Sequence, residues 1–243
     1  MPHNIFVGRI AESYDEDSPE MYLPAVVEPA VDFLVDAASD GPALEFGIGT
    51  GRLALPLSRR GVAVHGVDIS ADMLGQLHSK PGSEVIATTL GDFATTTVPG
   101  EFSLVYLVYN VISNLTSQEE QVACFCNAAA HLAPGGRLVI ELGVPDLRSF
   151  PPGAAAVPFE VSATRLGFDT LDIATQQLVS HHYLITGDRV ALFESPHRFA
   201  WPSELDLMAQ IAGLRLVERW GDWDRSAFTS ASMKHVSVWQ RPS

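Results

Sequence analysis

Three glycines spaced by two, Gly47, Gly49 and Gly51, follow a short apolar run and precede a helical pattern. Glycine at such a turn allows positive φ and lets a ligand approach bare backbone N–H groups. The chemistry that this stretch predicts is the binding of a nucleoside-containing ligand at the start of a helix. A dinucleotide fingerprint would have its third glycine at position 52, where this chain has Arg52, so the spacing disfavours NAD and favours another nucleoside.

Three further stretches carry residues that could serve the same ligand. Asp68 ends the apolar run 62–67, and Asp92 lies in Gly91-Asp92-Phe93 after a third apolar stretch. Residues 132–136, Leu-Ala-Pro-Gly-Gly, form a predicted turn before another apolar run. These turns and acids lie at the ends of predicted strands, and the ligands of open α/β sheets bind at the carboxyl ends of strands.

In this order, the four stretches between residues 43 and 141 resemble those of class I S-adenosylmethionine-dependent methyltransferases. Glu45 with the three glycines is similar to the first motif of that family. The resemblance implies S-adenosylmethionine as the cofactor, with Asp68 receiving the ribose hydroxyls and Asp92 accepting the adenine amino group. Arg52 could reach the methionyl carboxylate or pair with a neighbouring acid. The cofactor-binding residues expected on this basis are Tyr14, Tyr22, Glu45, Gly47, Gly49, Gly51, Arg52, Asp68, Ile69, Met73, Gly91, Asp92, Phe93 and Val108.

The elements that must position these residues alternate between strands and helices up to the fifth strand. A helix is predicted from about Gly51 to Arg60, Ser70 caps the next helix, and Ser117 with Glu120 forms a capping box that opens another one. The continuous apolar run 102–108 is typical of a parallel sheet covered on both faces. The predicted fold class is therefore α/β: a seven-stranded, mostly parallel, doubly wound, Rossmann-like methyltransferase sheet whose last strand is antiparallel.

After the fifth strand the apolar residues recur with a period of two. This pattern predicts three or four antiparallel strands, inserted as a cap at about 148–200, with Thr186-Gly187-Asp188 as a hairpin turn and a strand that ends at Ser195. Residues 1–38 are expected to form an N-terminal lid over the cofactor. The whole chain, 1–243, is expected to be a single domain, and a homodimer could form through the antiparallel cap.

The catalytic candidates are Tyr14, Tyr109, Asn114 and His182. An aromatic ring attracts a cation, so Tyr14 in the lid, together with Tyr22, is a candidate to cover a sulfonium. Tyr109 and Asn114 follow the fourth strand, at the edge of the sheet where reacting groups gather.

Two adjacent cap histidines, His181 and His182, face opposite ways on one strand, so at most one of them faces the pocket. Asn114 stands where some related enzymes carry a histidine, which leaves open whether a general base is used. His131, just before the turn at 132–136, is expected on the surface.

The composition narrows the function classes. A formal net charge of −14 with only two lysines, Lys80 and Lys234, opposes binding along a nucleic acid. No export signal and no membrane-length apolar run are visible, so a cytoplasmic location without membrane attachment is expected. Cys124 and Cys126 lie two apart on a predicted helix and cannot form a metal site by themselves, so no metal is expected.

These observations favour a methyltransferase for a small metabolite with a nitrogen or oxygen nucleophile. The cap and the Tyr14-Asp15 start resemble the bacterial small-molecule branch of the family, including N,N-dimethyltransferases of nucleotide-linked amino sugars. Two alternatives stay open at this point. One is a non-catalytic regulator that kept the cofactor-binding fold, and the other is an NAD-type oxidoreductase, which Arg52 disfavours.

Overall fold

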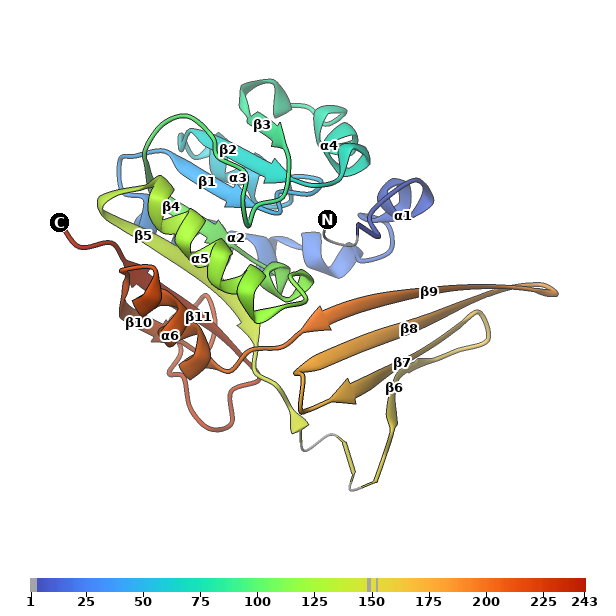
Figure 1. The fold of residues 1–243 in the computed structure, drawn as a ribbon. Coiled ribbons are helices and arrows are strands. Elements are labelled where there is room, and N and C mark those ends of the chain that lie inside the picture. The colour runs from blue at the N-terminus through green and yellow to red at the C-terminus, as the bar shows by residue number, and fades with distance from the viewer. Residues whose placement is uncertain (1–3, 148–149, 152) are drawn as a thin grey trace.

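The computed structural model describes residues 4–147, 150–151 and 153–243 (Figure 1). Seven strands form one sheet in the order β10-β11-β5-β4-β1-β2-β3. Their bounds are β1 Ala43–Phe46, β2 Val64–Asp68, β3 Ala87–Leu90, β4 Phe102–Leu107, β5 Leu132–Gly143, β10 Arg215–Trp220 and β11 Lys234–Gln240. The pairs within β3-β2-β1-β4-β5 are parallel, and β11 is antiparallel to both of its neighbours. The predicted α/β sheet with an antiparallel last strand is confirmed.

Helices cover both faces of this sheet. The longer ones are α2 Pro24–Ala38, α3 Ala54–Arg59, α4 Ala71–His78, α5 Gln118–His131 and α6 Pro202–Ile211, and the shorter turns are α1 Arg9–Ser13, η1 Pro19–Tyr22, η2 Ser83–Val85 and η3 Val111–Asn114. One core cluster joins the sheet to α2, α3 and α4, and a second joins it to α5 and α6. The inner strands are apolar on both faces because both faces are buried.

The local signals at helix starts are largely confirmed. Ser117 and Glu120 make both bonds of the capping box at α5, and the Ser70 hydroxyl accepts a hydrogen bond from the Met73 amide at α4. The helix expected from Gly51 begins three residues later, at Ala54, because Gly51 has φ +79° and the chain is still turning there.

Two other expectations were wrong. Strand β5 starts at Leu132, because a register shift against β4 takes the 133–136 segment into the strand. His131 is buried, not on the surface. Its Nε2 accepts a hydrogen bond from the Val98 amide at 3.0 Å and its Nδ1 lies 2.8 Å from the Asn127 carbonyl, and a buried imidazole is tolerated when both nitrogens are bonded.

A second sheet of four antiparallel strands projects beside the main one, between β5 and α6 (Figure 1). It consists of β6 Ala156–Val161, β7 Arg165–Asp172, β8 Gln177–Thr186 and β9 Arg189–Arg198, and we call it the cap sheet. Thr186 pairs with Arg189, so Gly187 and Asp188 form the predicted hairpin turn, with Gly187 at φ +62°. None of the helices in the described residues has the length and apolar composition needed to traverse a bilayer.

Candidate functional site

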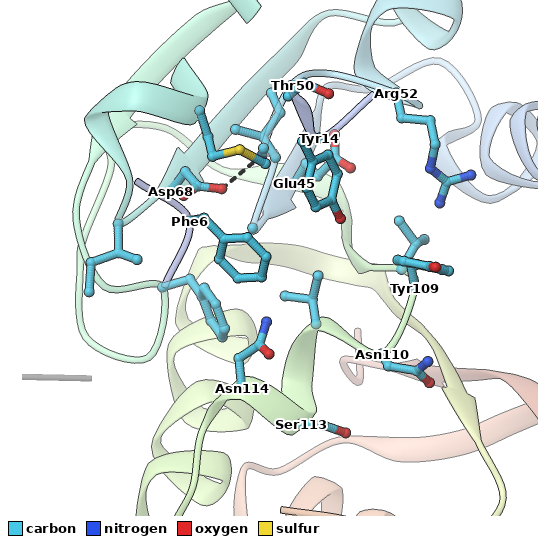
Figure 2. A pocket seen from close by; sticks show the side chains of 18 of the residues that line it. Phe6, Tyr14, Glu45, Thr50, Arg52, Asp68, Tyr109, Asn110, Ser113 and Asn114 are labelled. Atoms are coloured by element: carbon cyan, nitrogen blue, oxygen red, sulfur yellow. Dashed lines mark hydrogen bonds between the residues drawn. The ribbon is translucent and has the colours of Figure 1, made fainter. Parts of the chain in front are cut away.

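A cavity of about 540 Å³ opens at the carboxyl edge of the parallel strands (Figure 2). Its walls come from the N-terminal segment, from the turns after β1, β2 and β4, and from the ends of β8 and β9 in the cap sheet. Parallel strands leave a crevice at this edge where the strand order reverses, here between β1 and β4. The fold therefore brings most of the residues predicted from the sequence together around this cavity.

The glycine turn forms one wall of the cavity. Gly47 and Gly49 line it at φ +72° and +54°, and a Cβ on Gly49 would lie 3.3 Å from the Met73 Cε. Gly51 is not among the lining residues, and a Cβ there would lie 2.3 Å from Leu77 Cδ1. Packing therefore requires glycine at Gly51, and also at Gly47, where a Cβ would lie 2.5 Å from Val111 Cγ1, whereas Gly49 has only the end of the Met73 side chain beside it.

Asp68, at the end of β2, is fixed by backbone amides. Its two carboxylate oxygens accept hydrogen bonds from Gly49 at 2.7 Å and from Ser70 at 2.8 Å. Burial raises the pKa of Asp68, while these amide donors oppose the shift. Each carboxylate oxygen has a second lone pair, so the group can accept donors from a ligand as well.

Glu45, on β1, is a buried acid in the same wall. It accepts a hydrogen bond from the Tyr106 hydroxyl at 2.8 Å, and burial raises the pKa of Glu45 to about 8. Arg52 lines the cavity on the same side, with its guanidinium 5.5 Å from the centre of the Tyr109 ring. A carboxyl group and a guanidinium on one side of a cavity suit a ligand that carries both a positive and a negative charge.

The turn after β4 brings Tyr109 and Asn110 into the site. Both residues have positive φ, +57° and +60°, which non-glycine residues adopt only when their surroundings hold them there. The Tyr109 amide donates to Glu141 at 3.0 Å, and the Asn110 side chain accepts from the Gly143 amide at 2.7 Å. Strand β5 therefore holds this strained turn in shape.

The N-terminal segment closes the cavity from above. Figure 2 shows Phe6 and Tyr14 lying between Asp68 on one side and Arg52 with Tyr109 on the other. These two rings meet edge to face, with their centres 5.8 Å apart. Burial raises the pKa of Tyr14 to about 12, so its hydroxyl is protonated at neutral pH.

Asp15 fastens this segment to the glycine turn. Its carboxylate accepts a hydrogen bond from Thr50 Oγ1 at 2.6 Å and one from the Tyr22 hydroxyl, and it pairs with Lys80. Lys80 also donates to the Thr50 carbonyl at 2.7 Å. We call Asp15, Tyr22, Thr50 and Lys80 the lid clasp. Its acid and its lysine were not predicted as site residues, although Asp15 directly follows Tyr14.

Most of the predicted site residues line this one cavity. Those that do are Tyr14, Tyr22, Glu45, Gly47, Gly49, Arg52, Asp68, Ile69, Met73, Asp92, Phe93, Val108, Tyr109 and Asn114. Gly51 and Gly91 do not, and a Cβ on Gly91 would lie 2.2 Å from Thr96 Oγ1, which again indicates a packing role.

His182 is the catalytic candidate that the structure leaves outside the lining. Its ring stacks on Phe193 with centres 4.4 Å apart, and burial, with help from the charge on Arg165, lowers its pKa. His197, near the end of β9, lines the cavity instead. The expected strand ended at Ser195, and extending its period-two alternation by one step would have found His197.

Comparisons with known proteins agree with this geometry. A family model described as a methyltransferase domain matches residues 43–136. The chain is 34% identical to the solved CcbJ methyltransferase from Streptomyces caelestis, with a TM-score of 0.84 and 96% of each chain covered.

Two more distant relatives align along nearly the whole chain, one by sequence and one by structure. A cypemycin N-terminal methyltransferase from a Streptomyces species is 27% identical over 238 residues, covering 94% of this chain and 97% of the relative. The S-adenosylmethionine-bound amino pentose methyltransferase CalS10 from Micromonospora echinaspora is 20% identical, with a TM-score of 0.69 and coverage of 98% and 99%.

Proposed function

Since this chain belongs to the S-adenosylmethionine-dependent methyltransferases, we propose that it methylates a nitrogen or oxygen nucleophile of a small metabolite. The NAD-type oxidoreductase and the non-catalytic regulator are not favoured. The observation that supports the proposal best is the hydrogen bond from the Gly49 amide to Asp68 at the cavity wall. This bond places a glycine turn, which has no side chains, next to an acid with free lone pairs.

The residues present fit S-adenosylmethionine. Asp68 would accept the ribose hydroxyls, and Asp92, which follows the neighbouring strand β3, would accept the adenine amino group. Glu45 would pair with the ammonium group of the methionine part of the cofactor, and Arg52 would pair with the carboxylate of the same part. The groove over Gly47 and Gly49 has no Cβ, so the ligand can lie directly against the backbone.

When bound, the cofactor would supply an electrophilic methyl group that an in-line nucleophile can take, with the electron pair of the broken C–S bond staying on the sulfur. The task of the chain is to align the nucleophile, and well-aligned positioning can supply about 7–11 kcal/mol of the barrier. Tyr14 and Phe6 exclude water from above, and the protonated Tyr14 hydroxyl and ring offer a partner for positive charge without introducing a full negative charge. Tyr109 and Asn114 would orient the acceptor from the end of β4.

We propose that residues 1–38 act as the lid and residues 148–200 as the cap of one domain, 1–243, of which residues 1–3, 148–149 and 152 lie outside the described part of the chain. A homodimer through the cap, a cytoplasmic location and the absence of nucleic-acid and membrane partners stay predictions. The relatives named for an N-terminal amine and an amino pentose support nitrogen as the acceptor atom.

Calorimetric titration with S-adenosylmethionine, S-adenosylhomocysteine and NAD tests the cofactor. We expect the first two to bind and NAD not to bind. Incubation with S-adenosylmethionine and a panel of amines and alcohols, with mass-spectrometric detection of a gain of one methyl group, tests the transfer. Tight binding of NAD in place of S-adenosylmethionine would refute the proposal, and cofactor binding without any methylated product would favour the regulator.

A further inference from the structure

The cap sheet carries a row of polar side chains, two of which line the cavity. Asp169, Ser180 and Ser195 lie directly opposite one another on β7, β8 and β9, and His197 follows two residues later on the same face. Ser180 and His197 line the cavity, while Ser195 is buried behind them. We call these four residues the cap polar row.

Hydrogen bonds within the row fix which atoms can serve a ligand. Ser180 Oγ donates to Asp169 Oδ1 at 2.6 Å, so the lone pairs of that hydroxyl are free to accept. His197 Nε2 lies 2.8 Å from Ser195 Oγ, which can accept the ring hydrogen. His197 Nδ1 has no hydrogen-bonding partner within the described part of the chain. With its hydrogen on Nε2, the ring offers a lone pair on Nδ1.

The surroundings keep the His197 ring neutral but prepare it for a positive charge. Burial lowers the pKa of His197, and the negative charge of Asp169 opposes that shift. His182 is the other titratable group that interacts with it from β8, and η3, which packs against β9, contributes none. The neutral ring therefore has a free Nδ1 lone pair that can take a proton, and the charge of Asp169 offsets part of the cost of charging the ring.

The charges that line the cavity favour a cationic acceptor. Arg52 is the single lysine or arginine among the described lining residues, against Asp68, Asp92 and Glu45, the last mostly protonated at pH 7 because burial raises its pKa to about 8. The whole chain has a formal net charge of −14. An ammonium group is attracted into such a site, whereas a phosphate group finds few partners there.

Resting on the proposed function, we propose that the acceptor is an amine that enters the cavity as an ammonium group without a phosphate, is held by Ser180, and gives a proton to His197 Nδ1. The N–H bond of the ammonium breaks, its electron pair stays on the nitrogen, and a new N–H bond forms on the imidazole. The nitrogen lone pair is then the nucleophile. His197 is the catalytic residue, and Asp169 is a positioning residue that stabilises the imidazolium.

Three matched probes test the charge of the acceptor: L-tyrosine amide, its N-acetyl derivative and its O-phosphate, each titrated calorimetrically into the protein saturated with S-adenosylhomocysteine at pH 7. We expect tyrosine amide to bind at least about tenfold more tightly than either derivative, a difference of 1.4 kcal/mol. Asp169→Asn keeps an acceptor for Ser180 but removes the charge, and should weaken tyrosine amide about tenfold. Equal affinities, preference for the phosphate or no binding of tyrosine amide would overturn the proposal.

The rate of tyrosine amide methylation at pH 7 and pH 9.5 tests the proton transfer. An α-amino group has a pKa of about 7.7–8.0, so at pH 9.5 the acceptor arrives already deprotonated. His197→Gln should therefore lose about 100-fold at pH 7, the lower range for general base catalysis, and recover most of that loss at pH 9.5.

His181→Gln is the matched control, because His181 points to the other face of β8, toward Glu194 and Thr170, and should behave as the unchanged protein. An equal loss for His197→Gln at both pH values would show a purely structural role and overturn the proposal. Failure of S-adenosylhomocysteine to bind at all would instead contradict the proposed function.

Discussion

The backbone amide of Gly49 donates to the Asp68 carboxylate at 2.7 Å, which joins the turn after β1 to the end of β2. Strands β1 and β2 are parallel neighbours, so this bond forms where both strands end at the same edge of the sheet. The joint aligns one wall of the cavity before any ligand arrives.

Gly49→Ala should affect ligand binding and stability together. The new Cβ enters the space over Met73, and the positive φ of +54° costs alanine about 1–2 kcal/mol. We expect a lower thermal midpoint without ligand and loss of most of the stabilisation by S-adenosylhomocysteine, which follows RT ln(1 + [L]/Kd). The matched control is Gly51→Ala, which meets Leu77 outside the lining and should lower the midpoint but keep the ligand shift. The same ligand shift in both variants would contradict a cofactor role for Gly49.

Asp68→Ala should weaken cofactor binding by about 1.5–3 kcal/mol, the range for hydrogen bonds to a charged group. The surface variant Asp32→Ala removes an exposed pair with Arg60 and should leave the dissociation constant unchanged. Calorimetry with S-adenosylhomocysteine measures both. A wild-type affinity in Asp68→Ala would refute the ribose assignment. For Asp92, the loss in Asp92→Asn should be smaller than in Asp92→Ala, because the amide oxygen still accepts.

Cofactor binding near neutral pH should release protons from Glu45. Its pKa of about 8 in the free protein means that it is mostly protonated at pH 7, and a ligand ammonium favours the charged form. Calorimetry at pH 7 in two buffers of different ionisation enthalpy should therefore show proton release in the unchanged protein and much less in Glu45→Gln. Glu119→Gln, on the exposed side of α5, serves as the control. Equal release in all three proteins would show that Glu45 does not meet the ammonium.

The same group should destabilise the free protein as the pH rises. An acid whose pKa is raised by folding binds more protons in the folded state than in the unfolded state between pH values of about 4.3 and 8, so unfolding becomes easier across that window. Urea titrations at pH 5 and pH 8 should show a loss of stability with pH that is smaller in Glu45→Gln. A variant with an unchanged pH dependence would mean that the carboxyl is ionised throughout.

Opening the lid clasp should speed the release of S-adenosylhomocysteine. Burial alone would raise the pKa of Asp15, but the bonds from Lys80, Thr50 and Tyr22 outweigh it and lower that pKa. Asp15 is therefore ionised at any pH above the usual pKa of an aspartate. The clasp is lost only when the pH falls below that value and Asp15 takes up a proton. Asp15→Asn should raise the dissociation rate in stopped-flow measurements at pH 7, whereas the unchanged protein should release at a nearly constant rate between pH 5 and 8. Equal rates in the two proteins would show that the clasp does not control release.

Much of the fold and most of the cavity wall at the strand ends could be predicted from the sequence, because both depend on local patterns. The glycine spacing, the capping box at Ser117 and the period-two alternation of the cap each describe a few neighbouring residues. Asp68 and Asp92 were found in the same way, since each follows a strand whose end must lie at the edge of the sheet.

What could not be predicted depends on contacts between distant segments. His131 was misplaced because its two partners, Val98 and Asn127, come from a loop and from its own helix, and neither marks it as buried in the sequence. Gly51 looks like its two neighbours in the motif until Leu77 of α4 fills the space beside it. Lys80 pairs with Asp15, which lies far from it in the sequence, and no short pattern joins the two.

The lid clasp also makes the reactivity of a lysine toward acylating reagents depend on the position of the N-terminal segment. The two lysines of the chain, Lys80 and Lys234, are both held in ion pairs, the first by Asp15 of the clasp and the second by Glu141 and Asp222. Lys80 is the more deeply covered of the two, with 26% of its side chain exposed against 40% for Lys234. Lys80 holds Asp15 of the N-terminal segment from outside that segment, so an amine-reactive reagent should modify Lys80 more, relative to Lys234, when the clasp opens, and the ratio of the two modified peptides reports that opening.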